Sequence, residues 1–208
     1  MSAYAVICPR DDATAKQASS WCDDLRQVLD HKGGHHIVAC VDDRSPADSV
    51  SIANALASPS SLVLYFGHGT DAEWLTLSAA TIDRSTIGAA AGKAVVSIAC
   101  NTSRALGPDA ITAGVRSWLG FTFPVPVLSA VNRRDVLGEA LAAGLSCLAF
   151  NASMQQARDE LVRELGQMVH GLQYGVLSTH PGAEVGMFLV ECLRQHVALN
   201  GDAAHVPL

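Results

Sequence analysis

A histidine and a cysteine each follow an apolar run of strand length. Leu62–Phe66 leads into His68, which stands between two glycines, and Ala94–Ala99 leads into Cys100. Apolar runs of this length are typical of strands buried on both faces of a parallel sheet. Chemistry in open α/β sheets gathers at the carboxyl ends of such strands. We therefore expect His68 and Cys100 to meet at one edge of a sheet, where a Cys/His dyad could form.

The chemistry of such a dyad is nucleophilic. A thiol attacks a carbonyl as the thiolate, and a neighbouring imidazole both lowers the thiol pKa and protonates the leaving group. The pattern predicts Cys100 as the nucleophile and His68 as the general acid/base. The alternatives are that Cys100 is one more core thiol and that His68 is a turn residue whose flanking glycines serve the backbone alone.

These two blocks resemble those of the caspase-like cysteine peptidases, which include caspases, legumains, gingipains, separases and CHAT domains. In that superfamily an apolar block ending in His-Gly precedes one ending in Ala-Cys. The pairs here are His68-Gly69 and Ala99-Cys100, and the cysteine follows the histidine by 32 positions. The segment 107–127 is similar to the helix, glycine turn and strand that follow the cysteine in CHAT-like and bacterial members. Outside residues 60–127 the resemblance is one of architecture only.

The resemblance implies a caspase-like, flavodoxin-like α/β fold: a three-layer sandwich with a mostly parallel sheet and helices on both faces. It implies cysteine endopeptidase activity, with the backbone amides of Gly69 and Cys100 as the oxyanion hole. Such donors contribute about 3 kcal/mol of transition-state stabilisation each. No invariant third catalytic residue is implied.

The resemblance also implies a residue for the specificity pocket. In caspases and legumains a basic residue just after the first strand helps to bind the substrate side chain that precedes the cut. Arg10 has that position and would favour an acidic or amide side chain. The adjoining Asp11 and Asp12 leave open a pocket that selects Arg or Lys, and Arg10 could equally be a solvated loop charge.

Composition limits the other function classes. The 208 residues are 49% hydrophobic and 16% charged, which indicates a globular protein, and we expect one domain over residues 1–208. The net charge is −6 and the sequence has no basic cluster, which argues against nucleic acid as a partner.

The longest apolar run, 141–150, is shorter than the roughly 20 residues that span a bilayer. No signal peptide is recognised, and six scattered cysteines without a CxxC pair favour reduced thiols, so a cytoplasmic location is expected.

Strands and helices alternate along most of the chain, which predicts right-handed crossovers and a parallel sheet. Strands are expected at 4–8, 36–41, 62–66, 94–98 and 117–122, with a short hairpin arm at 73–77. Helices are expected at 13–32, 45–57, 83–91, 108–114, 133–150, 153–172 and 183–199. In the last helix an apolar face is in register, made by Val185, Phe188, Leu189, Cys192 and Leu193.

No cofactor or metal is expected. Gly67–Ala72 matches a loose dinucleotide pattern, but no acidic residue ends a strand about 20 positions later. Gly88–Lys93 is one residue short of a phosphate-binding loop and leads into a strand. His31, His35 and His36 lack a fourth ligand and are interrupted by two glycines, so they do not predict a metal site.

The sequence thus predicts a bacterial-type cysteine endopeptidase that acts on protein or peptide substrates. We expect its activity to be gated by a regulatory protein, a small-molecule activator or homodimerisation, because the chain is little more than the catalytic domain. CHAT-like and other prokaryotic relatives work in defence or regulated-death pathways, and the resemblance implies a similar setting. Two rivals stay open: a non-catalytic caspase-like module that binds a protein, and a flavodoxin-like binder of a nucleotide or small molecule.

Overall fold

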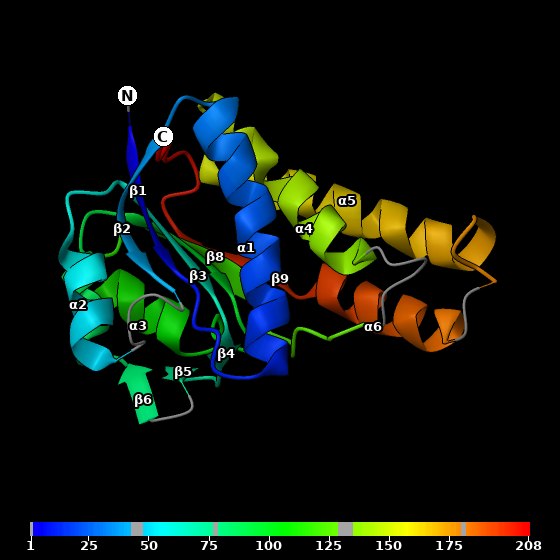
Figure 1. Ribbon diagram of the computed structural model, residues 1–208, viewed down its shortest axis with the longest axis horizontal. Helices are drawn as coiled ribbons and strands as arrows, with labels where there is room; N and C mark the ends of the chain where they lie inside the picture. Colours follow the sequence, from blue (N-terminus) through cyan, green and yellow to red (C-terminus); the bar gives the residue numbers. More distant parts are fainter. Residues whose placement is uncertain (1, 43–47, 77–78, 129–134, 180–181) are drawn as a thin grey trace.

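The computed structural model describes residues 2–42, 48–76, 79–128, 135–179 and 182–208 (Figure 1). A six-stranded sheet with the order β2-β1-β3-β7-β8-β9 lies at its centre. The strands are β1 (Ala3–Ile7), β2 (His36–Val41), β3 (Leu62–Phe66), β7 (Ala94–Ile98), β8 (Ser117–Phe121) and β9 (Val197–Gly201). The first five are parallel to their neighbours, and β9 runs antiparallel to β8. The predicted, mostly parallel sheet is confirmed.

Helices cover both faces of this sheet (Figure 1). The helices α1 (Ala13–His31), α4 (Val136–Leu145), α5 (Met154–Tyr174) and α6 (Ala183–Gln195) share one core, and α2 (Ser49–Ala57) and α3 (Leu106–Thr112) share the other. Along β1, Tyr4 and Val6 face the first core while Ala5 and Ile7 face the second, and all four are fully buried. Burial on both faces explains why the strands are continuous apolar runs, and the predicted three-layer sandwich is confirmed.

Helix α1 starts where the sequence places a capping residue. Asp12 has extended backbone geometry, and its Oδ1 accepts a hydrogen bond from the Ala15 N–H at 2.8 Å. This satisfies one of the amide groups that a helix N-terminus leaves without a partner. In the same way Asp48 caps α2 through the Ser51 N–H at 2.7 Å. The predicted start of that helix at 45–46 lies outside the described residues.

The last helix is shorter than predicted. It ends at Gln195, and Val197–Gly201 forms β9 in place of the expected final helical turn. The reason is tertiary: the edge of β8 is open there, and Phe121 to Ser117 pair in register with Val197 to Gly201. Backbone pairing along a whole strand outweighs the weak helical preference of these residues.

The apolar face predicted for α6 is correct at Leu193 and wrong at Val185 and Phe188. The residues that α6 buries are Ala183, Gly186, Val190 and Leu193, whereas Val185 is 63% and Phe188 is 64% exposed. A Cβ on Gly186 would lie at an ordinary contact distance of 3.8 Å from Leu172 of α5, so this side of α6 faces α5. The buried side combines the small Ala183 and Gly186 with the larger Val190 and Leu193, and Val185 and Phe188 lie outside.

Three other boundaries differ from the predictions. The described part of the expected helix 133–150 is divided into α4 and a 3₁₀ turn, Ser146–Phe150, and the expected helix 83–91 is a 3₁₀ turn at Ile87–Ala90. The hairpin arm belongs to a second sheet of β4 (His68–Gly69), β5 (Trp74–Thr76) and β6 (Ala79–Ile82). This small sheet starts at the candidate histidine. Among the described helices, none has the length and apolar content needed to cross a membrane.

Candidate functional site

The sheet register places the two candidate residues at equivalent positions. Phe66, the last residue of β3, pairs with Ile98, the last residue of the adjacent parallel β7. The Gly67 N–H extends this pairing by donating to the Ile98 carbonyl at 3.2 Å. His68 and Cys100 each follow two residues after the last pair. The chain therefore delivers both to the carboxyl edge of neighbouring strands, as predicted.

Gly69 brings the histidine turn against the cysteine loop. A Cβ built on Gly69 would lie 2.5 Å from Thr102 Cγ2, 3.1 Å from the Ala99 Cβ and 3.2 Å from the Cys100 carbonyl oxygen. No real side chain tolerates the first of these distances, so only glycine permits this approach. The residue that the resemblance assigned to the oxyanion hole thus has its backbone packed directly on the Cys100 loop.

His68 is held by a carboxylate that sequence reasoning did not assign to the dyad. Its Nε2 lies 2.9 Å from Asp12 Oδ2, and both side chains are about one-third exposed. Asp12 therefore uses one oxygen to cap α1 and the other to hold the imidazole. The Ala15 N–H and, next among the favourable contacts, His68 lower the Asp12 pKa, so the group is a carboxylate at neutral pH.

The contact with Asp12 also selects the tautomer of the imidazole. A neutral imidazole that donates its proton from Nε2 keeps a lone pair on Nδ1. Nδ1 is then the nitrogen that can accept a proton from a thiol. The only sequence signal for Asp12 was its position on the loop between the first strand and the first helix, at the same edge of the sheet.

Cys100 stands at a sharp turn. The next residue, Asn101, has a φ of 60°, in the left-handed region that few residues other than glycine and asparagine adopt. The Cys100 side chain is partly buried, and its Sγ lies 4.0 Å from the Val125 carbonyl oxygen. Cys100 therefore lies at a turn after β7, and its side chain is less buried than those of Cys8 and Cys22.

Three of the other cysteines, Cys22, Cys40 and Cys147, lie where burial disfavours the thiolate. Cys8 and Cys22 are fully buried, and all six thiols are free. Burial raises the pKa of Cys22 and of Cys147, and burial together with the Asp42 carboxylate raises that of Cys40 to about 12. A thiol with a raised pKa is a poor nucleophile at neutral pH.

A second set of contacts joins the two loops further out. The Asp71 carbonyl, three residues after His68, accepts hydrogen bonds from the N–H groups of Ala105 at 3.2 Å and Leu106 at 2.8 Å. Arg104 Nη1 lies 3.7 Å from Asp71 Oδ2, and both side chains are about half exposed. The loops after β3 and β7 are therefore held together on both sides of Gly69.

Arg10 lies at the same edge but contacts α1. Its Nε donates to Ser19 Oγ at 2.6 Å, and its Nη2 forms an ion pair with Asp23 at 2.7 Å. A substrate carboxylate would have to compete with Asp23 for this guanidinium. The assignment of Arg10 to a specificity pocket stays a prediction.

Within the described ranges, no cluster of three or more His, Cys, Asp or Glu side chains could hold a metal ion. The discounted His35 instead contacts the Ala149 carbonyl through Nε2 at 3.1 Å.

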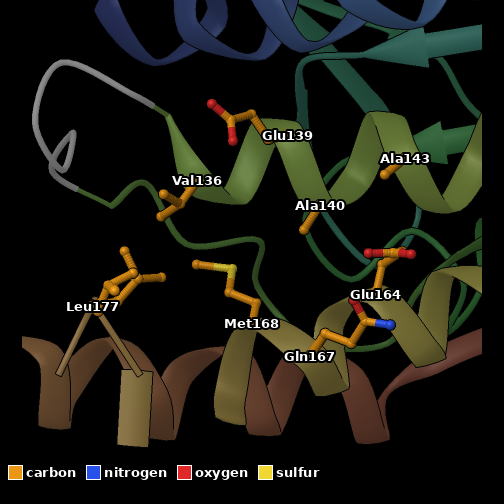
Figure 2. A pocket seen from close by; sticks show the side chains of 9 residues that line it. Val136, Glu139, Ala140, Ala143, Glu164, Gln167, Met168 and Leu177 are labelled. Carbon is orange, nitrogen blue, oxygen red and sulfur yellow. The ribbon is translucent and has the colours of Figure 1, made fainter. Parts of the chain in front are cut away.

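A separate open hollow of about 340 Å³ lies between α4 and α5 (Figure 2). Its lining includes Ala140, Met168 and Leu177 and shares no residue with the His68 and Cys100 loops.

Comparisons with known proteins agree with this architecture. No family model matches the sequence, and no curated protein matches it. Among solved structures, the Arg-specific cysteine proteinase gingipain R (RgpB) is similar, with a TM-score of 0.57 and 13% identity over 99% of this chain and 46% of the gingipain chain. The complex of Porphyromonas gingivalis RgpB pro- and mature domains gives the same TM-score and identity and 48% coverage of that chain. This chain thus spans less than half the length of either match, and what the likeness shows is that it has the caspase-like α/β fold found in gingipain R.

Proposed function

We propose that this protein is a cysteine endopeptidase in which Cys100 and His68 form the catalytic dyad and Asp12 holds the histidine. The observation that carries the proposal is the close packing of Gly69 on Ala99, Cys100 and Thr102. This packing joins a histidine turn to a cysteine loop at the carboxyl edge of two parallel strands. The fold likeness to a cysteine proteinase supports the same reading.

In the proposed reaction, the Cys100 thiol leaves the Val125 carbonyl and gives its proton to His68 Nδ1. The thiolate attacks the peptide carbonyl carbon, and the N–H groups of Gly69 and Cys100 stabilise the oxyanion. His68 then protonates the leaving amine, and a thioester with Cys100 remains. A water molecule deprotonated by His68 hydrolyses this thioester. Throughout, the Asp12 carboxylate stabilises the imidazolium form of His68.

Two substrate preferences follow from the charges near the site. If Arg10 were released from Asp23, it would favour an acidic or amide side chain before the cut. The carboxylates of Asp11 and Asp12, on the loop after β1, and of Asp71, on the loop after β3, favour a basic side chain. The ion pair between Arg10 and Asp23 supports the second preference, because it neutralises the guanidinium of Arg10.

We also propose that a second component governs the activity. One solved match is a gingipain mature domain in complex with its pro-domain. For this chain the candidates are a regulatory protein, a small-molecule activator or a second copy of the chain. A cytoplasmic location and a role in bacterial defence belong to the same proposal.

Peptide cleavage tests the proposed function. The purified protein is assayed on fluorogenic peptides that carry Arg, Lys, Asp or Asn before the cut, alongside Cys100→Ala, His68→Ala and the matched control Cys192→Ala. The proposal predicts that Cys100→Ala and His68→Ala lose cleavage and that Cys192→Ala keeps it. Cleavage that survives in Cys100→Ala would contradict the assignment.

A further inference from the structure

A ladder of buried aromatic rings lies beneath the two candidate loops. Tyr65 of β3 and Trp74 of β5 stack with ring centroids 4.0 Å apart and an interplanar angle of 3°. Trp118 of β8 follows, with its centroid 5.6 Å from that of Trp74. All three side chains are fully buried. They form a rigid floor, and each carries a polar atom that must find a partner in the core.

The polar atom of Tyr65 is directed to the histidine turn. Its hydroxyl lies 2.6 Å from the His68 carbonyl oxygen and 3.1 Å from that of Leu75. A Cβ on Gly67 would lie only 3.0 Å from the same hydroxyl, so the ring tip packs directly under this turn. Burial raises the Tyr65 pKa well above its usual value, so the group donates a proton at every working pH. The hydrogen bond fixes the backbone from which the imidazole projects.

The polar atom of Trp74 is directed to the cysteine loop. Its Nε1 donates to Ser97 Oγ at 3.0 Å, and Ser97 Oγ lies 3.0 Å from Thr102 Oγ1. Thr102 is fully buried, follows Cys100 by two residues, and its methyl group is the atom that touches Gly69 most closely. The contact with Ser97 Oγ therefore fixes the rotamer of Thr102. The methyl group of Thr102 in turn fixes the position of Gly69.

We infer that Tyr65, Trp74, Ser97 and Thr102 form a buried bridge that sets the separation between His68 and Cys100. These are positioning residues, and the inference rests on the proposed function. The bridge reaches both loops through buried hydrogen bonds, where hydroxyls and an indole N–H would cost stability if they were unpaired. A misplacement on the scale of 1 Å is enough to slow catalysis severely.

Removal of the Tyr65 hydroxyl tests the bridge. Tyr65→Phe keeps the ring stack and loses the hydroxyl contacts with the His68 and Leu75 carbonyls. The matched control is Tyr4→Phe, because Tyr4 is also fully buried and its hydroxyl contacts Asp30 on the opposite face of the sheet. The readouts are kcat and KM on a cleaved peptide and the pH dependence of Cys100 alkylation by iodoacetamide, followed by mass spectrometry. All variants are also compared in urea unfolding.

We expect Tyr65→Phe to lower kcat about tenfold with little change in KM and to move the alkylation midpoint of Cys100 to higher pH. Tyr4→Phe should lose stability without either change. A second pair keeps the test decisive if Tyr65→Phe fails to fold: Thr102→Val should behave like Tyr65→Phe, and Thr102→Ser, which keeps the hydroxyl, should recover part of kcat.

Two outcomes overturn the inference in different ways. In the first outcome the wild-type protein cleaves peptide, and Tyr65→Phe and Thr102→Val have the same kcat and the same Cys100 alkylation profile as the wild type. The bridge is then wrong and the dyad stands. If wild-type Cys100 is alkylated no faster than Cys192 and cleaves nothing, the dyad itself is wrong, and the bridge falls with it.

Discussion

Asp12 Oδ2 lies 2.9 Å from His68 Nε2, and the other oxygen of the same carboxylate caps α1. One side chain therefore joins the first crossover helix to the candidate general base. The two residues are 56 positions apart in the sequence. The contact occupies Nε2 of His68, so Nδ1 is the ring nitrogen that can accept a proton from a thiol. Asp12 thus has a structural role as the cap of α1 and a proposed chemical role as the partner of His68. Substitutions can test the two roles separately.

Asp12→Asn separates them. Asparagine caps helices about as well as aspartate, so the free energy of unfolding should change by less than about 1 kcal/mol. The amide cannot stabilise an imidazolium, so kcat should fall at least about tenfold. Asp12→Ala should lose both the cap and the activity. Urea unfolding and peptide cleavage measure the two effects, and full activity in Asp12→Asn would contradict the proposed role.

Gly69→Ala tests the close approach of the two loops. The new methyl group would collide with Thr102, and the repacking should cost about 1–3 kcal/mol and separate the loops. We expect cleavage to fall at least about 100-fold. Gly88→Ala is the control, because its Cβ would meet no atom closer than 3.7 Å. Equal activity in the two variants would show that the approach does not matter.

Protonation of the buried His205 should lower the stability of the protein in mild acid. It is 6% exposed, its Nδ1 lies 3.0 Å from Ser117 Oγ, and burial, then Arg116, lowers its pKa below the usual 6.5. The folded state therefore prefers neutral His205, so this contribution is complete above the unfolded pKa and is lost as the pH falls below about 6.5. Urea unfolding at pH 7.5 and 5.5 should show a smaller pH-dependent loss in His205→Gln than in the wild type. An identical loss in both proteins would exclude His205 as the cause.

A substitution on the outer face of α6 should leave the stability unchanged, although the sequence pattern predicts that it would destabilise the protein. Phe188→Ser should change the free energy of unfolding by less than about 0.5 kcal/mol, because the ring is 64% exposed. Leu193→Ala, at a fully buried position of the same helix, should cost about 2–5 kcal/mol. Urea unfolding compares them directly. Equal losses would mean that Phe188 is covered in solution.

The parts of the fold that follow from local pattern could be predicted from the sequence. Strands buried on both faces leave continuous apolar runs, so β1, β3, β7 and β8 were recognisable, and with them the sheet edge that carries His68 and Cys100. The edge strand β2 was also recognisable as an apolar run, although it is only partly buried. The close contact of Gly69 with the Cys100 loop agrees with the order and spacing of the two motifs.

What depends on distant partners could not be predicted. The pairing of Asp12 with His68 joins two loops and leaves no periodic signal. Strand β9 forms because β8 offers an open edge, while its own residues continue the apolar pattern of α6. The buried side of α6 includes Ala183 and Gly186, and a hydrophobicity pattern ranks the exposed Val185 and Phe188 above them.

The measurement that tests the central claim most directly is labelling by a peptidyl chloromethyl ketone, with the modified residue located by mass spectrometry. The account predicts that Cys100 reacts ahead of the other five thiols and that this preference is lost in His68→Ala. Prior exposure to a cleaved peptide should slow the labelling. Labelling of Cys100 at the rate of Cys192, or at an unchanged rate in His68→Ala, would contradict a Cys100/His68 dyad.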